Sequence, residues 1–130
     1  MVQAREPWFA SSGVELITAE RERQMMVEGW SADHDDGHTK GEMALAAAVY
    51  AVPEETREQT ILGRSLQHLL WPWPGWWKPG RAPYSHPGRT EPADQRAHEL
   101  VKAGALIAAE LDRLARRCKA ADSQERTCGA

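Results

Sequence analysis

The segment from residue 71 to residue 92, WPWPGWWKPGRAPYSHPGRTEP, restricts the fold more than any other part of the chain. It contains six of the eight prolines, and proline lacks the backbone N–H that helices and inner strands require. Its glycines further disfavour regular structure. We therefore expect a long loop here, between helical segments. Long loops in small domains are usually functional or disordered.

A first helix is predicted ahead of this loop, over residues 13–28. Ser12 precedes Glu15 by three positions, which is the spacing of a capping box, where two side chains bond each other's backbone N–H groups at a helix start. Apolar residues, including Ile17, follow at near-helical spacing. Gly29 is the expected stop, because glycine readily adopts the positive φ that often follows a helix.

A second helix is predicted over residues 40–51, where Thr39 and Glu42 repeat the capping-box spacing ahead of MALAAAVYAV. This segment is apolar nearly all round, so we expect it at the centre of the core, and Pro53 ends it. Residues 54–70 are expected to form one or two short helical turns. Their expected buried positions are Leu62, Leu66, Leu69 and Leu70.

The strongest helical pattern covers residues 92–117. A proline near its start and arginines near its end agree with the preferences of helix termini. One stripe of this helix carries Leu100, Gly104, Ile107, Leu111 and Leu114. The sequence therefore predicts an all-α fold, a small bundle of three to four helices with a long Trp/Pro/Gly-rich loop. We expect a single helical domain over residues 1–130, with a core at about 12–117 and a flexible tail at 118–130.

Composition narrows the classes of function. The net charge of −3 argues against coating of nucleic acid or of an anionic membrane, since both require a basic surface. No run of about 18 apolar residues suits a membrane span, and the first residues do not resemble an export signal. We therefore expect a cytoplasmic protein, with Cys118 and Cys128 as reduced thiols, whose partner is neither nucleic acid nor membrane.

The stretch EGWSADHDDGH, residues 28–38, gathers most of the candidate chemistry. Asp35, Asp36, His38 and Glu42 form an alternative metal set, because they offer the nitrogen and oxygen donors that zinc, manganese or iron accepts. Alternatively, the aspartates stabilise the next helix through its dipole, or accept hydrogen bonds from backbone N–H groups or an arginine. The spacing does not decide between these interpretations.

A third interpretation is ligand recognition. An indole stacks on a nucleobase while a carboxylate bonds ribose hydroxyls or a base amine, and Trp30 lies close in sequence to Asp35 and Asp36. Phosphates would then require two or three cations from the set Arg21, Arg23, Lys40, Lys78, Arg81, Arg89, Arg96 and Lys102. The four tryptophans of residues 71–77 either cap the core or line an interface or ligand groove, since exposed aromatic surface marks such sites.

The stretch RERQMMVEGWSADHDDGH, the Trp-Pro-Trp and Trp-Trp-Lys-Pro loop and the later RAHELVKAGALIAAELDRL resemble a group of short proteins of tailed bacteriophages and prophages, over most of residues 15–115. About half of the chain resembles, more distantly, the ryanodine receptor repeat domain, where an amphipathic helix leads to a Gly-Trp pair and an acidic couplet. The residues that match are Trp30, Asp35, Asp36, Glu99 and Lys102. The receptor repeats continue with a His-Pro and Val-Pro-Tyr segment, whereas this chain enters a helix at Thr39.

The resemblance implies a small, phage-encoded helical module that binds a nucleotide-derived ligand. Such a module would sequester a nucleotide second messenger of bacterial antiviral defence, like a sponge, in the cytoplasm of the infected host. We expect no cofactor, and a homo-oligomer whose subunit contacts complete the pocket. The candidate ligand-binding residues are Trp30, Asp35, Asp36, His38, Trp73, Trp77, Lys78, Arg96, Glu99 and Lys102.

Two other functions stay open. A metal-dependent all-α nucleotide hydrolase would hold an ion and a water with the alternative metal set, but the late helix reads ELVK, with a lysine where such hydrolases place a ligand. A protein-binding inhibitor would use Trp73, Trp76 and Trp77. The chain has no GxSxG motif and no glycine-rich phosphate loop, so nucleophilic catalysis has no support and we favour a non-enzymatic protein.

Overall fold

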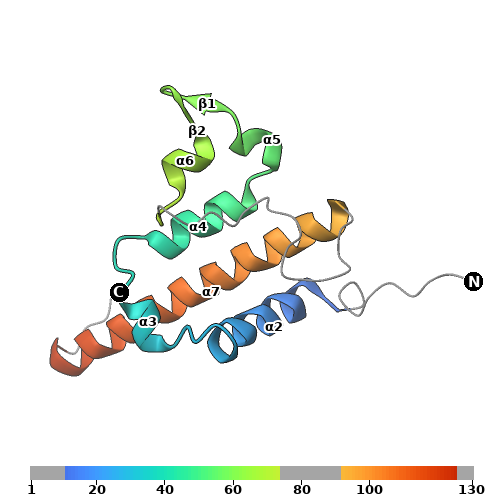
Figure 1. The fold of residues 1–130 in the computed structure, drawn as a ribbon. Coiled ribbons are helices and arrows are strands. Elements are labelled where there is room, and N and C mark those ends of the chain that lie inside the picture. The colour runs from blue at the N-terminus through green and yellow to red at the C-terminus, as the bar shows by residue number, and fades with distance from the viewer. Residues whose placement is uncertain (1–10, 74–91, 126–130) are drawn as a thin grey trace, which may run out of the picture.

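Three helices carry the fold, and the longest of them lies between the other two (Figure 1). The computed structural model describes residues 11–73 and 92–125. Helix α2 covers Gly13–Met26, α4 covers Glu42–Ala51 and α7 covers Pro92–Glu125. Because α7 packs against both α2 and α4, it connects parts of the chain that are far apart in sequence. The described part is mostly helical, as predicted.

Helix α2 begins as its sequence predicts. The Ser12 hydroxyl accepts a hydrogen bond from the Glu15 N–H at 3.2 Å, and a Glu15 carboxylate oxygen accepts one from the Ser12 N–H at 2.7 Å. These bonds complete the capping box. The helix ends at Met26, two residues before the predicted end, and Gly29 then adopts the expected positive φ, of 76°.

The apolar core lies between α4 and α7, so the second helix contributes to the core as predicted, but the central helix is α7 and Leu45 of α4 is exposed. Its buried members are Met43, Ala46, Ala47, Tyr50, Ala103, Leu106 and Ala109. The many alanines let the two helix backbones approach closely. Trp30, Trp71 and Trp73 are partly buried and pack against this core.

The start of α4 differs from the prediction. Its N-cap is Gly41, at a φ of 79°, and no side chain caps it, so the expected capping box at Thr39 does not form. The Glu42 carboxylate instead accepts a hydrogen bond from the Lys40 N–H at 2.7 Å. The left-handed backbone conformation of Gly41 changes the direction of the chain just before α4. Glycine adopts this conformation without strain because it has no Cβ atom.

Residues 54–70 form two short helices, as predicted, separated by a hairpin that the sequence analysis missed. The elements are α5 (Glu54–Arg57), β1 (Thr60–Ile61), β2 (Arg64–Ser65) and α6 (Leu66–Leu70). The strands pair antiparallel, and both turn residues, Leu62 and Gly63, have a positive φ, as in the tight turns that suit hairpins. Leu62 at the turn is 92% exposed, and Leu69 is also exposed, so the predicted burial of these two leucines is wrong.

Helix α7 extends beyond its predicted end, and its leucine stripe is not in the core. Leu100, Ile107, Leu111 and Leu114 are all exposed. Gly104 of α7 packs against α2: a Cβ added at this glycine would come within 2.5 Å of the Ile17 Cδ1 atom, so the glycine permits the close approach of the two helices.

Cys118 is disulfide-bonded, which corrects the predicted reduced thiol, while Cys128 lies outside the described residues. The predicted loop beyond residue 73, with Trp76, Trp77 and Lys78, also lies outside them. In the part of the chain that the structure describes, no helix has the length and apolar character needed to cross a bilayer.

Candidate functional site

A short helix, α3 (Ala32–Asp36), lies where the sequence predicts a polar connection. The Ser31 hydroxyl caps it by accepting a hydrogen bond from the His34 N–H at 3.2 Å. Asp33 and Asp35 lie in its first turn, where the helix dipole favours negative charge. The helix turns the two neighbouring acids, Asp35 and Asp36, toward different surroundings.

Asp35 is fully buried and holds a histidine in place. One carboxylate oxygen accepts a hydrogen bond from Nη2 of Arg21 at 2.7 Å, and the other lies 3.0 Å from Nδ1 of His34. Because an ionised carboxylate only accepts hydrogen bonds, Nδ1 of His34 is the donor in this contact. Asp35 therefore acts through His34 and has no exposed surface for a ligand.

Next to His34 lies a cavity of about 110 Å³, which we call the aromatic pocket. Its lining residues are Trp30, His34, His38, Met43, Trp73 and Leu106. The Trp30 ring stacks on His34 with centroids 5.6 Å apart, and His38 meets both His34 and Trp73 edge-on at 5.0 and 5.4 Å. Four aromatic rings thus form a continuous wall over an apolar floor.

The size and polarity of the aromatic pocket suit a flat ring. A protein cavity of roughly 150 Å³ holds benzene, so this somewhat smaller, partly open space matches part or all of one planar ring. The Glu42 carboxylate lies 3.8 Å from Nδ1 of His38. Burial acts to raise the pKa of Glu42, but hydrogen bonds from its own N–H and from the Lys40 N–H lower it overall. Each histidine in the wall thus has a carboxylate near its Nδ1 atom, Asp35 at 3.0 Å from His34 and Glu42 at 3.8 Å from His38.

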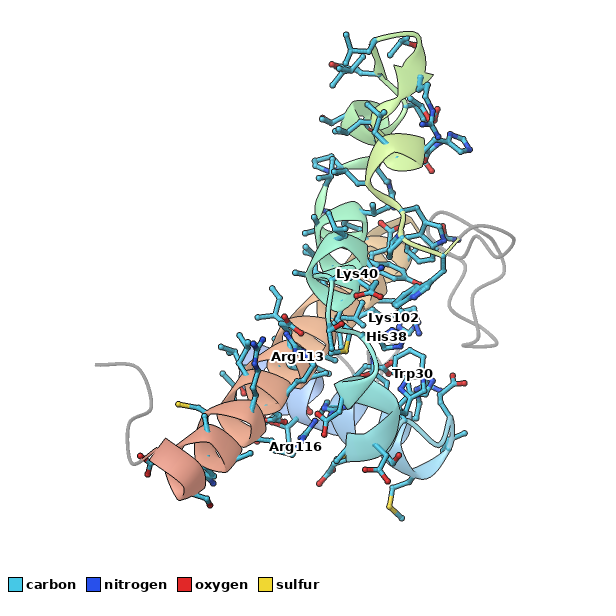
Figure 2. The ribbon with its side chains drawn as sticks, turned by 90° about the vertical axis from the view of Figure 1, so that its left-hand side faces the viewer. Trp30, His38, Lys40, Lys102, Arg113 and Arg116 are labelled. Carbon is cyan, nitrogen blue, oxygen red and sulfur yellow. The ribbon has the colours of Figure 1, made fainter. Side chains whose placement is uncertain are left out.

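Asp36 faces a different cavity, of about 390 Å³, which we call the arginine groove. Its lining residues are Asp36, Thr39, Arg113, Arg116, Arg117 and Ala120. Arg116 donates to Asp36 at 2.8 Å and Arg113 donates to Glu110 at 2.8 Å, so two of its three guanidinium groups are already paired. Figure 2 shows Arg113 and Arg116 on one side of α3, and Trp30 and His38 on the other.

Of the candidate residues Trp30, Asp35 and Asp36, only the indole therefore lines the aromatic pocket. Trp30 and His38 line the aromatic pocket, whereas Asp35 is sealed behind His34 and Asp36 lines the arginine groove. The reason is that Arg21 holds the Asp35 carboxylate in the interior, whereas Arg116 holds the Asp36 carboxylate at the surface. Trp73, also predicted, does line the pocket.

The three candidates on α7 hold elements together. Glu99 is buried and bonds the Arg57 guanidinium of α5 at 2.8 and 3.2 Å. Arg96 donates to the carbonyl groups of Tyr50 and Val52 at the end of α4, at 3.1 and 3.3 Å. The Lys102 ammonium lies 3.5 Å from a carboxylate oxygen of Glu20, on α2.

The four residues of the alternative metal set are not brought together. Asp35 is buried against Arg21 and Asp36 is paired with Arg116 at the surface, and within this set only His38 and Glu42 approach each other. Across residues 11–73 and 92–125, no three histidine, cysteine, aspartate or glutamate side chains are grouped so that they could hold a metal ion.

Sequence reasoning missed three residues of the aromatic pocket. His34 lies four positions before His38 in the stretch EGWSADHDDGH, but the sequence analysis did not select it as a ligand-binding residue. Met43 and Leu106 are ordinary apolar residues of two helices, and nothing in their local sequence distinguishes a pocket floor from any other core position. Comparison of this chain with known protein families, with curated proteins and with solved structures finds no match.

Proposed function

We propose that this protein is a non-catalytic binding module for a nucleotide-derived small molecule, with the nucleobase held in the aromatic pocket. In this proposal α2, α4 and α7 form a small helical bundle that keeps the pocket walls rigid. One observation carries it: two indoles and two imidazoles surround a cavity whose floor is apolar. Stacking of a base on an aromatic side chain contributes about 1–3 kcal/mol, whatever the base.

Asp35 holds the His34 ring in the pocket wall, because its carboxylate accepts a hydrogen bond from Nδ1. The ring therefore presents a fixed stacking surface to the base, without a preference among the bases.

Lys102 is the cation proposed to meet the phosphate end of the ligand. It precedes Leu106, a floor residue of the pocket, by one helical turn on α7, so the two side chains lie on the same helix face. Its ammonium is 3.5 Å from Glu20, a long ion pair that a phosphate oxygen could replace.

Ion pairs at the acidic residues support binding without turnover. The carboxylates of Asp35, Asp36 and Glu99 are each held by an arginine, at 2.7 or 2.8 Å. A carboxylate in such a pair is a poor base for activating water. Together with the phage resemblance, this favours a sponge-like protein that lowers the free concentration of a nucleotide second messenger of antiviral defence.

Calorimetric titration with a panel of nucleoside monophosphates, dinucleotides and cyclic nucleotides tests the proposal. We expect one or more of them to bind, and His38→Ala to weaken binding at least about tenfold, equivalent to about 1.4 kcal/mol. His68→Ala is the matched control, because His68 is an exposed histidine on α6, outside the pocket lining. Equal losses in the two variants, or no binding by any nucleotide, would overturn the assignment of the pocket.

Recovery of the bound ligand separates binding from turnover. Chromatography of the ligand after denaturation should return it unchanged. Accumulation of product that requires added Mn²⁺ would favour the hydrolase alternative instead.

A further inference from the structure

The arginine groove is the larger of the two cavities described above, and the proposed nucleobase site does not use it. Its volume is about 390 Å³, against about 110 Å³ for the aromatic pocket. Sites for small molecules in proteins usually measure about 300–1,000 Å³. The groove therefore has room for a small molecule, and its lining decides which chemistry it can hold.

The groove is lined mainly by cationic side chains of α7. Arg113, Arg116 and Arg117 are three and four residues apart, so they share one face of the helix. Like charges at this spacing repel each other. Asp36 is the one acid among the residues that line the groove, so an anion bound there would relieve part of this repulsion.

Two of these guanidinium groups are paired within the chain, but each pair uses only one edge of the group. Arg113 donates through Nε and Nη2 to Glu110, at 2.8 and 2.9 Å. Arg116 donates through Nε and Nη2 to Asp36, at 3.1 and 2.8 Å. Among residues 11–73 and 92–125, Nη1 of each arginine has no hydrogen-bond partner. These N–H groups remain as donors for a ligand.

The same ion pairs hold the two arginines in place before a ligand arrives. The Arg113 side chain is 6% exposed and the Arg116 side chain is 34% exposed. A side chain that is already ordered loses less conformational entropy when it binds a ligand.

Arg117 is the guanidinium group that no acid of the described chain balances. It is exposed, and it forms no hydrogen bond or ion pair with the residues that the structure describes. Its five N–H donors are therefore all available. Thr39, on the connection between α3 and α4, adds a hydroxyl group to the lining.

We propose that the arginine groove binds the phosphate or pyrophosphate group of a small molecule. A carboxylate is satisfied by one guanidinium group, as Glu110 is by Arg113. A phosphate group has three terminal oxygens, which accept hydrogen bonds from several guanidinium groups at once. A long nucleic acid is a poor fit, because it requires an extended basic surface and this chain carries a net charge of −3. The inference does not depend on the proposed nucleotide site, since no residue lines both cavities.

Calorimetric titration with pyrophosphate and with ribose 5-phosphate tests the proposal, because neither probe contains a nucleobase. We expect at least one of them to bind with a dissociation constant of about 1 mM or lower, and succinate to bind at least about tenfold more weakly. Arg117→Ala should weaken binding of the phosphate probe at least about tenfold. Arg64→Ala is the matched control, because it removes the same charge from β2, which lies far from α3 (Figure 1).

A second pair of variants blocks the groove without removing an arginine. Ala120→Glu places a carboxylate in the lining and should abolish binding of the phosphate probe. Ala121→Glu adds the same charge one residue further along α7, outside the lining, and should change the affinity by less than about threefold. All three positions, 117, 120 and 121, are exposed, so circular dichroism should show unchanged folding.

Three results would overturn the proposal: no binding of either phosphate probe, equal losses within either pair of variants, or binding of succinate as tight as that of the phosphate probe. The source of the phosphate is identified by titrating a nucleotide in the presence of saturating pyrophosphate. Unchanged nucleotide affinity would assign the groove to a separate phosphorylated molecule, whereas competition would assign it to the phosphate end of the nucleotide. Both results support a phosphate site in the groove.

Discussion

Replacing Glu99 with glutamine should cost about 3–5 kcal/mol of unfolding free energy, because it leaves a buried guanidinium without its counter-charge. Arg57 is 2% exposed and Glu99 is 4% exposed, and two hydrogen bonds of 2.8 and 3.2 Å join them. Arg96 also lies 3.3 Å from Glu99, so a second cation loses its partner in the same variant. The change removes charge without removing volume, so a cavity does not contribute.

This loss is large relative to the stability of a small protein. Folded domains are stable by about 5–15 kcal/mol, so a loss of about 3–5 kcal/mol is roughly a fifth or more of the total. At about 2.1 cal/mol/K of unfolding entropy per residue, a chain of this length should melt about 10–20 °C lower. Thermal and urea unfolding followed by circular dichroism measure both quantities.

The double variant Arg57→Met with Glu99→Leu is the control, because it replaces both charges with apolar groups and should recover most of the lost stability. A loss of less than about 1 kcal/mol in Glu99→Gln, below the range for breaking a buried pair, would refute the structural role argued for Glu99. If that variant instead bound nucleotide more weakly at unchanged stability, Glu99 would be the ligand contact that the sequence predicted.

Three further predictions address other parts of the molecule. Asp35→Asn should lower the free energy of unfolding by about 3–5 kcal/mol, and the neighbouring Asp36→Asn by at most about 1 kcal/mol, because the Asp35–Arg21 pair is buried and the Asp36–Arg116 pair is exposed. Urea unfolding measures both values, and equal losses would contradict this reasoning. Burial acts to raise the pKa of Glu20, but nearby positive charges lower it overall, below its usual value of 4.5. The ionised Glu20 side chain therefore stabilises the folded protein fully above pH 4.5, and this contribution is lost as the pH falls through the lower pKa of the folded state. Urea midpoints should therefore fall more steeply below pH 4.5 in the wild type than in Glu20→Gln, and parallel curves would refute the argument. Gly104→Ala should destabilise the protein by about 1–3 kcal/mol, because the added methyl group would overpack against Ile17. In an Ile17→Ala variant the same change should stabilise the protein, since alanine has a better helix propensity than glycine. Stabilisation in both backgrounds would show that α2 and α7 do not meet closely at Gly104.

Local sequence patterns predicted the elements whose formation depends on neighbouring residues. The capping box of Ser12 and Glu15 and the positive φ of Gly29 are encoded within a few positions, and both occur in the structure. The burial of α4 follows from its composition, since a helix that is apolar nearly all round has no face suited to water. The hairpin at Leu62 was missed because its turn uses leucine, and not the usual asparagine or aspartate, ahead of Gly63.

The candidate site was harder to predict because its geometry depends on distant partners. Whether Asp35 faces a ligand or the interior is decided by Arg21, fourteen residues earlier, and Asp36 is directed by Arg116, eighty residues later. The burial of α7 could not be predicted for a similar reason. Periodicity identifies an apolar stripe on a helix, but it does not say whether other parts of the same chain cover that stripe, and the predicted leucine stripe of α7 is exposed. Trp30, His38 and Trp73 could be selected as recognition residues by type, and the folded chain brings them to one pocket.

The histidine side-chain NMR resonances provide the most direct measurement of the central claim, that the aromatic pocket receives a nucleobase. Titration with the nucleotide that binds most tightly in calorimetry should shift the imidazole signals of His34 and His38 with one common dissociation constant, because a stacked base changes the ring-current field at both. The signal of His68, on α6 and outside the pocket lining, should stay in place. Saturable binding that leaves His34 and His38 unshifted would contradict the account.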